Sequence, residues 1–233
     1  MAQLVEAGRR TPLSRDRVLR AAVALADEAG IEAVSMRRLA QELGVVPMAL
    51  YKHVANKDEL LDGMVDVLVG EIDPAVPSAD WQTAVRQRIL SARRALRRHL
   101  WASRLVESRP APTPVVLAYL ESMIGMFRTG EFSVDLTHHV MHALGSRMFG
   151  FTQELFDNSV SVDPAVQAAA LRQMSGAYPH IVEVASGGGH DERSAVGAGC
   201  DDQFEFEFGL DLLLDGFDRL RRQGWSSTRP AAP

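Results

Sequence analysis

The chain of 233 residues contains one cysteine, Cys200, which excludes an intramolecular disulfide and a zinc site built from several cysteines. No apolar run approaches the ~18 residues that cross a bilayer, and residues 1–14 lack the apolar stretch of a signal peptide. We therefore expect a cytoplasmic protein with no membrane partner. Lysine is also scarce, because Lys52 and Lys57 are the only two in the chain and every other basic residue is arginine.

Positive charge is in deficit, with a net charge of −5 at pH 7, which at first argues against a nucleic-acid partner. The distribution is uneven: residues 1–57 hold nine Lys and Arg against six Asp and Glu, and residues 58–233 hold 16 against 24. A mildly basic head on an acidic body is typical of a regulator with one DNA-binding end. The hydrophobic content of 46% is that of a globular protein with a core.

Residues 35–57 predict two short helices joined by a tight turn. Ser35 suits the N-cap of the first helix, and Gly44 supplies the left-handed conformation that ends it. Pro47 suits the first turn of the second helix, where a missing N–H costs nothing. The inward positions are apolar: Met36, Leu39, Ala40, Leu43, Val45, Leu50 and Val54. This pattern indicates a helix-turn-helix, which places its second helix in the DNA major groove.

The residues that follow the turn support a nucleic-acid partner. Tyr51 has a ring that can pack on the domain and a hydroxyl that can reach a phosphate. Asn56 and Glu59 have the spacing of a capping box and predict the start of another helix. Lys57 then falls in the first turn of that helix, where a cation opposes the helix dipole. Such a cation indicates a use outside the helix, and a phosphate is the expected partner.

On these residues, the segment from about Ser14 to Leu68 resembles the N-terminal domain of the TetR family of transcriptional regulators. The matching stretches are Ser35-Met36-Arg37-Arg38-Leu39-Ala40, Leu43-Gly44-Val45, Leu50-Tyr51-Lys52-His53-Val54 and Asn56-Lys57-Asp58-Glu59-Leu60-Leu61. Residues 206–216 are similar to the last helix of one branch of that family. The resemblance implies an all-α fold: an N-terminal three-helix helix-turn-helix domain followed by a larger C-terminal helical domain for ligand binding and dimerisation.

The helix-turn-helix predicts which side chains meet double-stranded DNA. We expect Arg37 to contact a base as a long donor, and Pro47 and Met48 to touch base edges or thymine methyl groups. The phosphates would be held by Tyr51, Lys52, His53 and Lys57. The chain departs from the family at Val46, where a small or hydroxyl residue is common. Valine has no side-chain acceptor, so it cannot cap the recognition helix.

The chain divides by function into a flexible arm at 1–13, a DNA-binding domain at 14–72, a ligand-binding and dimerisation domain at 78–223, and a flexible tail at 224–233. The helices expected in the second domain span about 80–99, 100–107, 114–129, 133–157, 164–185 and 202–223. Arginines stud the first of these, and we interpret them as a solvated or acid-paired face. Residues 186–200 read as a glycine-rich linker.

The resemblance also implies a small-molecule effector and a homodimer. The candidate lining of the effector site is aromatic, thioether or histidine: Trp101, Met123, Met126, Phe127, His138, Met141, His142, Phe149 and Tyr178. Flexible thioethers suit a broad, largely apolar effector. The helix at 133–157 and the last helix would pair with their symmetry mates, with Phe208, Leu212, Leu213 and Phe217 as candidate interface. A dimer sets two recognition helices about 34–36 Å apart, as a palindromic operator requires.

The reading that we favour is a ligand-released repressor with no enzymatic activity and no cofactor. The rival is a metal-binding all-α protein or hydrolase that uses His138, His139 and His142, of which the first and last share a helix face. That rival lacks an evident nucleophile, general base or third metal ligand. A TetR-type activator is a further alternative.

Overall fold

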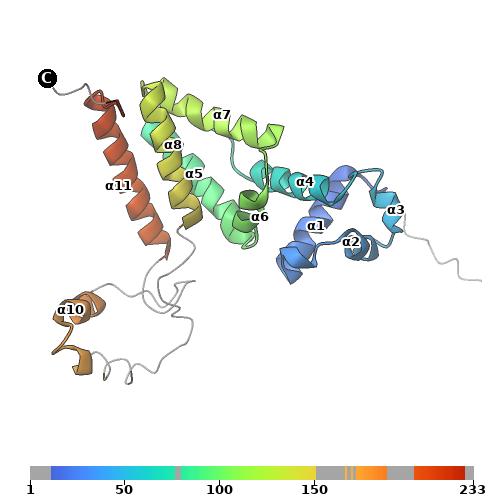
Figure 1. The fold of residues 1–233 in the computed structure, drawn as a ribbon, viewed down its shortest axis with the longest axis horizontal. Coiled ribbons are helices and arrows are strands. Elements are labelled where there is room, and N and C mark those ends of the chain that lie inside the picture. The colour runs from blue at the N-terminus through green and yellow to red at the C-terminus, as the bar shows by residue number, and fades with distance from the viewer. Residues whose placement is uncertain are drawn as a thin grey trace, which may run out of the picture. The chain divides into compact units, whose positions relative to one another are not determined.

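The computed structural model describes residues 12–76, 80–150, 166, 169, 172–187 and 202–228 (Figure 1). Every regular element within these residues is a helix, which confirms the predicted all-α class. None of the helices in this described part is both long enough and apolar enough to span a bilayer. The chain forms two compact units, Met1–Gly130 and Glu131–Pro233.

The first unit contains the helix-turn-helix and the three helices that follow it. Its elements are α1 (Arg15–Ala29), the 3₁₀ helix η1 (Ile31–Ala33), α2 (Met36–Glu42), α3 (Pro47–Leu50), α4 (Lys57–Gly70), α5 (Trp81–Arg98), α6 (Ala102–Ser108) and α7 (Pro114–Thr129). The turn η1 was not predicted. The predicted boundary at residues 72–78 separates a DNA-binding segment from a ligand-binding segment by expected function. By packing, α5–α7 belong to the same compact unit as the N-terminal helices.

Side-chain caps set the helix starts as the sequence predicts. The hydroxyl of Ser14 accepts from the Arg17 N–H at 3.2 Å, which starts α1. The carboxamide oxygen of Asn56 accepts from the Glu59 N–H at 2.8 Å, which starts α4. The Glu59 carboxylate reaches back to the N–H of Ala55 at 2.6 Å, one residue earlier than a capping box requires. These bonds satisfy donors that a helix terminus leaves free.

One hydrophobic core joins α1–α4 to the first turn of α6. Its fully buried members include Val18, Ala22, Leu39, Leu50, Leu60, Met64 and Ala102. Helix α1 crosses α4 at Gly63, where an added Cβ would lie 2.5 Å from a methyl carbon of Leu19. A larger residue at this position would therefore displace the Leu19 side chain, and glycine allows the close approach of the two helices. Because Ala102 and Leu105 complete the core, a movement of α6 changes the packing of the DNA-binding helices.

The second unit contains α8 (Val134–Gly150), α10 (Pro179–Gly187) and α11 (Asp202–Arg222), and α8 packs against α11. Residues 204–208 alternate like a strand but lie in α11, so the helical spacing of the residues that follow decides their conformation. Arg147 of α8 donates to the carbonyl oxygen of Glu205 at 2.7 Å. An added Cβ at Gly209 would lie 2.4 Å from the Arg147 guanidinium, so glycine leaves space for this contact.

Two predictions in this unit need correction or restriction. The single helix expected at 164–185 is wrong: residues 172–174 are helical, 175–177 form a turn, and α10 begins at Pro179. A proline disfavours the helical conformation of the residue before it, here Tyr178, so the chain restarts at Pro179. Residues 151–157 of the helix expected at 133–157, and most of the linker at 186–200, lie outside the described residues.

Candidate nucleic-acid interface

The turn before the recognition helix has the predicted geometry. Gly44 has φ +64°, a left-handed conformation that favours glycine, and the N–H of Val45 donates to the carbonyl oxygen of Ala40 at 2.9 Å. Val46 occupies the N-cap of α3 without a side-chain hydrogen bond, which confirms the loss of the capping bond. Leu50 is fully buried and anchors α3 to the core. The turn and one buried leucine therefore fix which face of α3 is presented outward.

The outward face of α3 is apolar at its start and polar further on. Val46 is 67% exposed and Met48 is 71% exposed. Tyr51 is 46% exposed. Pro47 and Lys52 are exposed, and His53 is half-buried. The face offers methyl and thioether groups where the bases of a major groove would lie.

The exposed cations of the DNA-binding helices are of two kinds, those bound to a carboxylate and those without a side-chain partner among the described residues, and Arg38 of α2 is of the second kind. Arg37, Lys52 and Lys57 are exposed, and none of them forms a hydrogen bond or ion pair with another of the residues that the structure describes. Arg15, by contrast, binds Glu59 at 3.2 Å. The surface thus keeps its cations available for an outside anion.

A second example shows the same contrast on α1. Arg20 binds both carboxylate oxygens of Asp16 at 2.9 Å. Its side chain is exposed, so burial does not explain why it is paired while Arg37 and Lys57 are not. The sequence carries part of this difference, because Asp16 and Arg20 have the i, i+4 spacing of a helical ion pair, whereas the adjacent residues Lys57 and Asp58 do not face each other on a helix.

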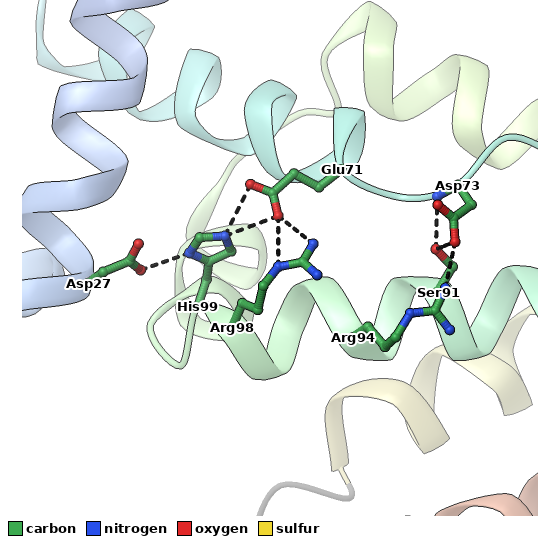
Figure 2. Close-up of polar contacts among 7 residues, drawn as sticks. All are labelled: Asp27, Glu71, Asp73, Ser91, Arg94, Arg98 and His99. Carbon is green, nitrogen blue, oxygen red and sulfur yellow. Dashed lines mark hydrogen bonds and ion pairs between the residues drawn. The ribbon is translucent and has the colours of Figure 1, made fainter.

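The DNA-binding helices are tied to α5 and α6 by a cluster of buried or half-buried polar groups (Figure 2). His99, at the end of α5, has Nδ1 2.7 Å from the Asp27 carboxylate of α1 and Nε2 3.2 Å from Glu71, just beyond α4. The indole N–H of Trp101 donates to the same oxygen of Asp27 at 2.7 Å. Three helices therefore meet at two carboxylates, and none of these contacts was predicted.

Glu71 also binds Arg98, whose Nη2 lies 2.6 Å from the carboxylate (Figure 2). Partial burial raises the pKa of Glu71, but the hydrogen bonds from Arg98 and His99 outweigh it and hold the pKa below its ordinary value. Its carboxylate is therefore ionised at neutral pH and keeps the end of α4 attached to α5.

Asp73 makes a similar attachment two residues further along. Its carboxylate accepts from the hydroxyl of Ser91 at 2.8 Å and binds Arg94 at 2.5 Å (Figure 2). The Ser91 hydrogen bond, together with the charge of Arg94, lowers the pKa of Asp73. The ion pairs Arg94–Asp73 and Arg98–Glu71 confirm that at least part of the arginine face of α5 is bound to carboxylates.

Comparison with known families agrees with this geometry. A model of bacterial regulatory proteins of the tetR family matches residues 18–64, and a model of the tetracyclin repressor-like C-terminal domain matches residues 73–221. The second match alone covers more than half of the chain. The chain belongs to the TetR family. It is accordingly a ligand-responsive, DNA-binding transcriptional regulator, from a family whose members are generally not enzymes.

Two TetR-family relatives show how far the similarity extends. The transcriptional repressor DrrR1 of Streptomyces coeruleorubidus is 28% identical over 231 residues, 96% of this chain and 84% of the relative. The structure of ActR from Streptomyces coelicolor without a ligand is similar with a TM-score of 0.71 and 27% identity, over 92% of this chain and 99% of ActR. ActR in complex with actinorhodin gives a TM-score of 0.66, over 90% of this chain and 98% of ActR.

The residues predicted to line the effector site of this TetR-family chain fall in both compact units. In the first unit, Met123 and Phe127 of α7 are buried, Met126 is half-buried, and the ring of Trp81 lies 5.7 Å from that of Phe127. Trp101 belongs to the core of the DNA-binding helices and bonds to Asp27, so we leave it out of the proposed lining.

The second unit holds the other predicted lining residues. Met141 and Phe149 of α8 are half-buried, His138 and His142 of α8 are exposed, and Tyr178, just before α10, is 54% exposed. Among the described residues, the predicted lining thus falls into one group on α7 and another on α8. Tyr178 belongs to neither helix.

One depression lies between the linker after α4 and helix α5, with a volume of about 340 Å³. It is lined by Asp73, Pro74, Ala75, Val76, Ala84, Gln87, Arg88, Leu90 and Arg94. None of the predicted lining residues reaches it. The guanidinium of Arg88 lies 4.9 Å from the ring centre of Tyr119 on α7, and burial raises the pKa of that phenol.

The three histidines of α8 are close in space but do not form a metal-binding group. The His138 ring lies 4.7 Å from that of His142 and 5.1 Å from that of His139, centre to centre. His139 is turned toward Trp225, at 5.3 Å, and toward the Asp135 carboxylate, at 3.6 Å. Within the described part of the chain, no three histidine, cysteine or acidic side chains have an arrangement suited to a metal ion.

Asp135 also holds the start of the tail that was expected to be flexible from residue 224. Its carboxylate accepts from the N–H of Ser227 at 2.6 Å and from the Ser226 hydroxyl at 3.0 Å. The Ser227 N–H is the main reason why the pKa of Asp135 lies below its ordinary value. Residues 224–228 are thereby attached to α8, and residues 229–233 lie outside the described part.

The candidate interface residues of α11 are not equally available. Phe208 is 53% exposed and Leu212 is 58% exposed, whereas Leu213 is half-buried and Phe217 is buried within its own unit. Phe204 was not predicted, although it is 62% exposed and its ring stacks on Phe208 at 6.3 Å. The helical spacing of four residues was the sequence signal that would have identified it.

Proposed function

We propose that the protein is a repressor that binds a palindromic DNA operator as a homodimer and is released by a small, largely apolar molecule. The observation that carries the DNA proposal is a set of exposed cations in or near the helix-turn-helix that have no partner among the described residues. These are Arg37, Lys52 and Lys57, while Arg15 and Arg20 on α1 are bound to carboxylates. Duplex DNA supplies the phosphates that such cations bind.

We assign base contacts and phosphate contacts to these residues from their exposure and side-chain chemistry. Met48 and Pro47, which are exposed and apolar, contact base edges or thymine methyl groups. Arg37 reaches a base as a long donor. Tyr51, Lys52, His53 and Lys57 bind phosphates, and they set the register of the helix without reading the sequence.

Dimerisation is supported by the exposed apolar row Phe204, Phe208 and Leu212, which are four residues apart along α11. Three large apolar side chains on one helix face are costly to leave in water, so a second copy of the chain is the proposed cover. The dimer presents two copies of α3 one helical turn of DNA apart.

The effector proposal is supported by the family and by relatives. Solved structures hold ActR with actinorhodin and with (S)-DNPA, so a similar chain accommodates small molecules. We propose that the effector binds the C-terminal domain and favours an arrangement with lower DNA affinity. The effector can shift the equilibrium between the DNA-binding and the released conformation only as far as its affinities for the two conformations differ. We place the protein in the cytoplasm, where its DNA lies.

Selection of bound fragments from random or genomic DNA tests the function. The full chain is expected to enrich a palindrome with half-sites one helical turn apart, and adding the effector should release it. No enrichment at low salt would reject the DNA-binding proposal. Enrichment of a site without two-fold symmetry would reject the homodimer instead, because a symmetric dimer reads symmetric half-sites.

A further inference from the structure

A row of aspartates on α4 is bound by the loop that joins α6 to α7. Asp58, Asp62 and Asp66 are four residues apart, so they share one face of the helix. Arg109 binds the first two: its Nε lies 2.7 Å from Asp62, and its Nη2 lies 3.2 Å from Asp58. The hydroxyl of Thr113 donates to Asp66 at 2.5 Å. One short loop therefore holds three carboxylates of the helix that begins at Lys57.

Local sequence ends α6 at Arg109. Arg109 ends α6 with φ −80° and ψ 131°, and its N–H still donates to the carbonyl oxygen of Val106. Pro110 follows, and a proline disfavours the helical conformation at the residue before it. The extended backbone ends α6 at this point, and the side chain, only 12% exposed, bonds to α4.

The bound carboxylates lie beside a proposed phosphate contact. Asp58 follows Lys57 directly, and its side chain is 81% exposed even with Arg109 in place. Asp62 is one turn further along the same face. Electrostatic interactions act over about 8 Å at physiological salt, and adjacent Cα atoms are about 3.8 Å apart. Without the charge of Arg109, both carboxylates would repel the phosphate that Lys57 binds.

We propose that Arg109 is a positioning residue for DNA binding that offsets part of the negative charge of Asp58 and Asp62 beside Lys57, so that the α6–α7 loop sets DNA affinity without contacting DNA. This rests on the proposed function, because it takes DNA as the partner of Lys57. Arg109 lies within residues 73–221, the part of the chain that matches the C-terminal domain of the family. An effector that withdraws the loop leaves two uncompensated carboxylates at the DNA-facing end of α4.

The experiment measures the affinity of the full chain for a palindromic duplex recovered by selection and for sheared mixed-sequence DNA. Arg109→Gln is expected to weaken binding to both by about fivefold at low salt, with a smaller effect at high salt. Adding Asp58→Asn and Asp62→Asn to Arg109→Gln removes one positive and two negative charges in total, so affinity is expected to return at least to the wild-type value. A packing defect would not be repaired by removing two carboxylates, so this rescue separates charge from structure.

The matched control is Arg94→Gln, which also breaks an arginine–carboxylate pair, with Asp73, beyond the far end of α4. Helix α4 has 14 residues and is thus about 20 Å long, so that pair lies outside the screening distance and the control should bind as wild type does. If Arg109→Gln does not fold, Asp58→Asn with Asp62→Asn in the wild-type background replaces it and should bind DNA more tightly than wild type.

Three results would overturn the proposal. Equal affinities of wild type and Arg109→Gln would reject this inference alone. A triple variant that binds as weakly as Arg109→Gln would show that the residue acts through packing. Failure of the wild type to bind either DNA at low salt would reject the proposed function, and this inference with it.

Discussion

Replacing Lys57 by alanine removes an exposed cation at the first position of α4 that has no partner among the residues that the structure describes. The side chain packs against nothing in the core, and the N-cap bond from the Glu59 N–H to Asn56 is independent of it. A cation at a helix N-terminus opposes the helix dipole, so the substitution should stabilise α4 by about 0.3–0.5 kcal/mol. Any loss of DNA binding is therefore not a loss of folding.

The size of the effect follows from counterion release. Each phosphate contact contributes about 0.9 to the slope of log K against log salt concentration on duplex DNA, and a dimer loses two contacts. The slope should flatten by about 1.8. Between 50 mM and 200 mM salt, wild type should therefore lose about tenfold more affinity than Lys57→Ala. The loss should be similar for all DNA sequences, because a phosphate contact carries no base information.

Fluorescence anisotropy of a labelled duplex at four or more salt concentrations measures the slope, and thermal unfolding checks the fold. Arg20→Ala is the matched control, since Arg20 is an exposed cation of the same domain that is bound to Asp16. Its slope should equal that of wild type. A Lys57→Ala slope equal to wild type would remove Lys57 from the phosphate contacts, and with it the premise that unpaired cations mark the DNA-facing surface.

Three further predictions address the dimer, the recognition helix and the tie between α4 and α5. Phe208→Glu should convert the dimer to a monomer in sedimentation experiments and weaken operator binding, and a dimer of unchanged stability would place the interface elsewhere. Val46→Thr supplies the missing N-cap acceptor and should raise the free energy of unfolding in urea by about 1 kcal/mol, whereas no gain would mean that the threonine hydroxyl does not reach the N–H groups of α3. Glu71→Gln removes a carboxylate whose folded pKa is depressed, so its stabilising effect is fully present above the ordinary value of 4.5 and is lost as the pH falls through the lower folded value. The difference in unfolding free energy between Glu71→Gln and wild type should be largest near pH 7 and shrink toward pH 3, and a difference independent of pH would exclude a role for the Glu71 charge.

The sequence was sufficient where the deciding interactions are local. The starts of α1 and α4 depend on hydrogen bonds between residues three apart, which the Arg17 N–H donates to Ser14 and the Glu59 N–H donates to Asn56. The turn at Gly44 depends on one residue that adopts φ +64° at low cost. Helix type, helix ends and the helix-turn-helix could therefore be predicted. The prediction failed at 164–185, where the turn before Pro179 outweighed an otherwise helical composition.

The pairing of charged side chains between distant segments could not be predicted from local sequence. Asp58 binds Arg109, 51 residues away, and its neighbour Lys57 has no partner among the described residues. Trp101 looked like a ligand contact by type, but it bonds to Asp27, 74 residues away. The short tail after α11 is attached to Asp135, 92 residues before it. Periodicity shows which face a side chain occupies, but not which face of another helix lies opposite it.

The amino-acid sequence by itself determined the helices and the turn before α3, because each depends on residues within one or two helical turns along the chain. These local features form the helix-turn-helix, which indicated DNA as the partner. Only the tertiary structure decided which exposed cations have no partner among the described residues and which carboxylates of α4 are bound by the loop after α6. Those outcomes depend on how α4, α5 and the loop after α6 approach one another, and that approach is set by the packing of residues distant in sequence.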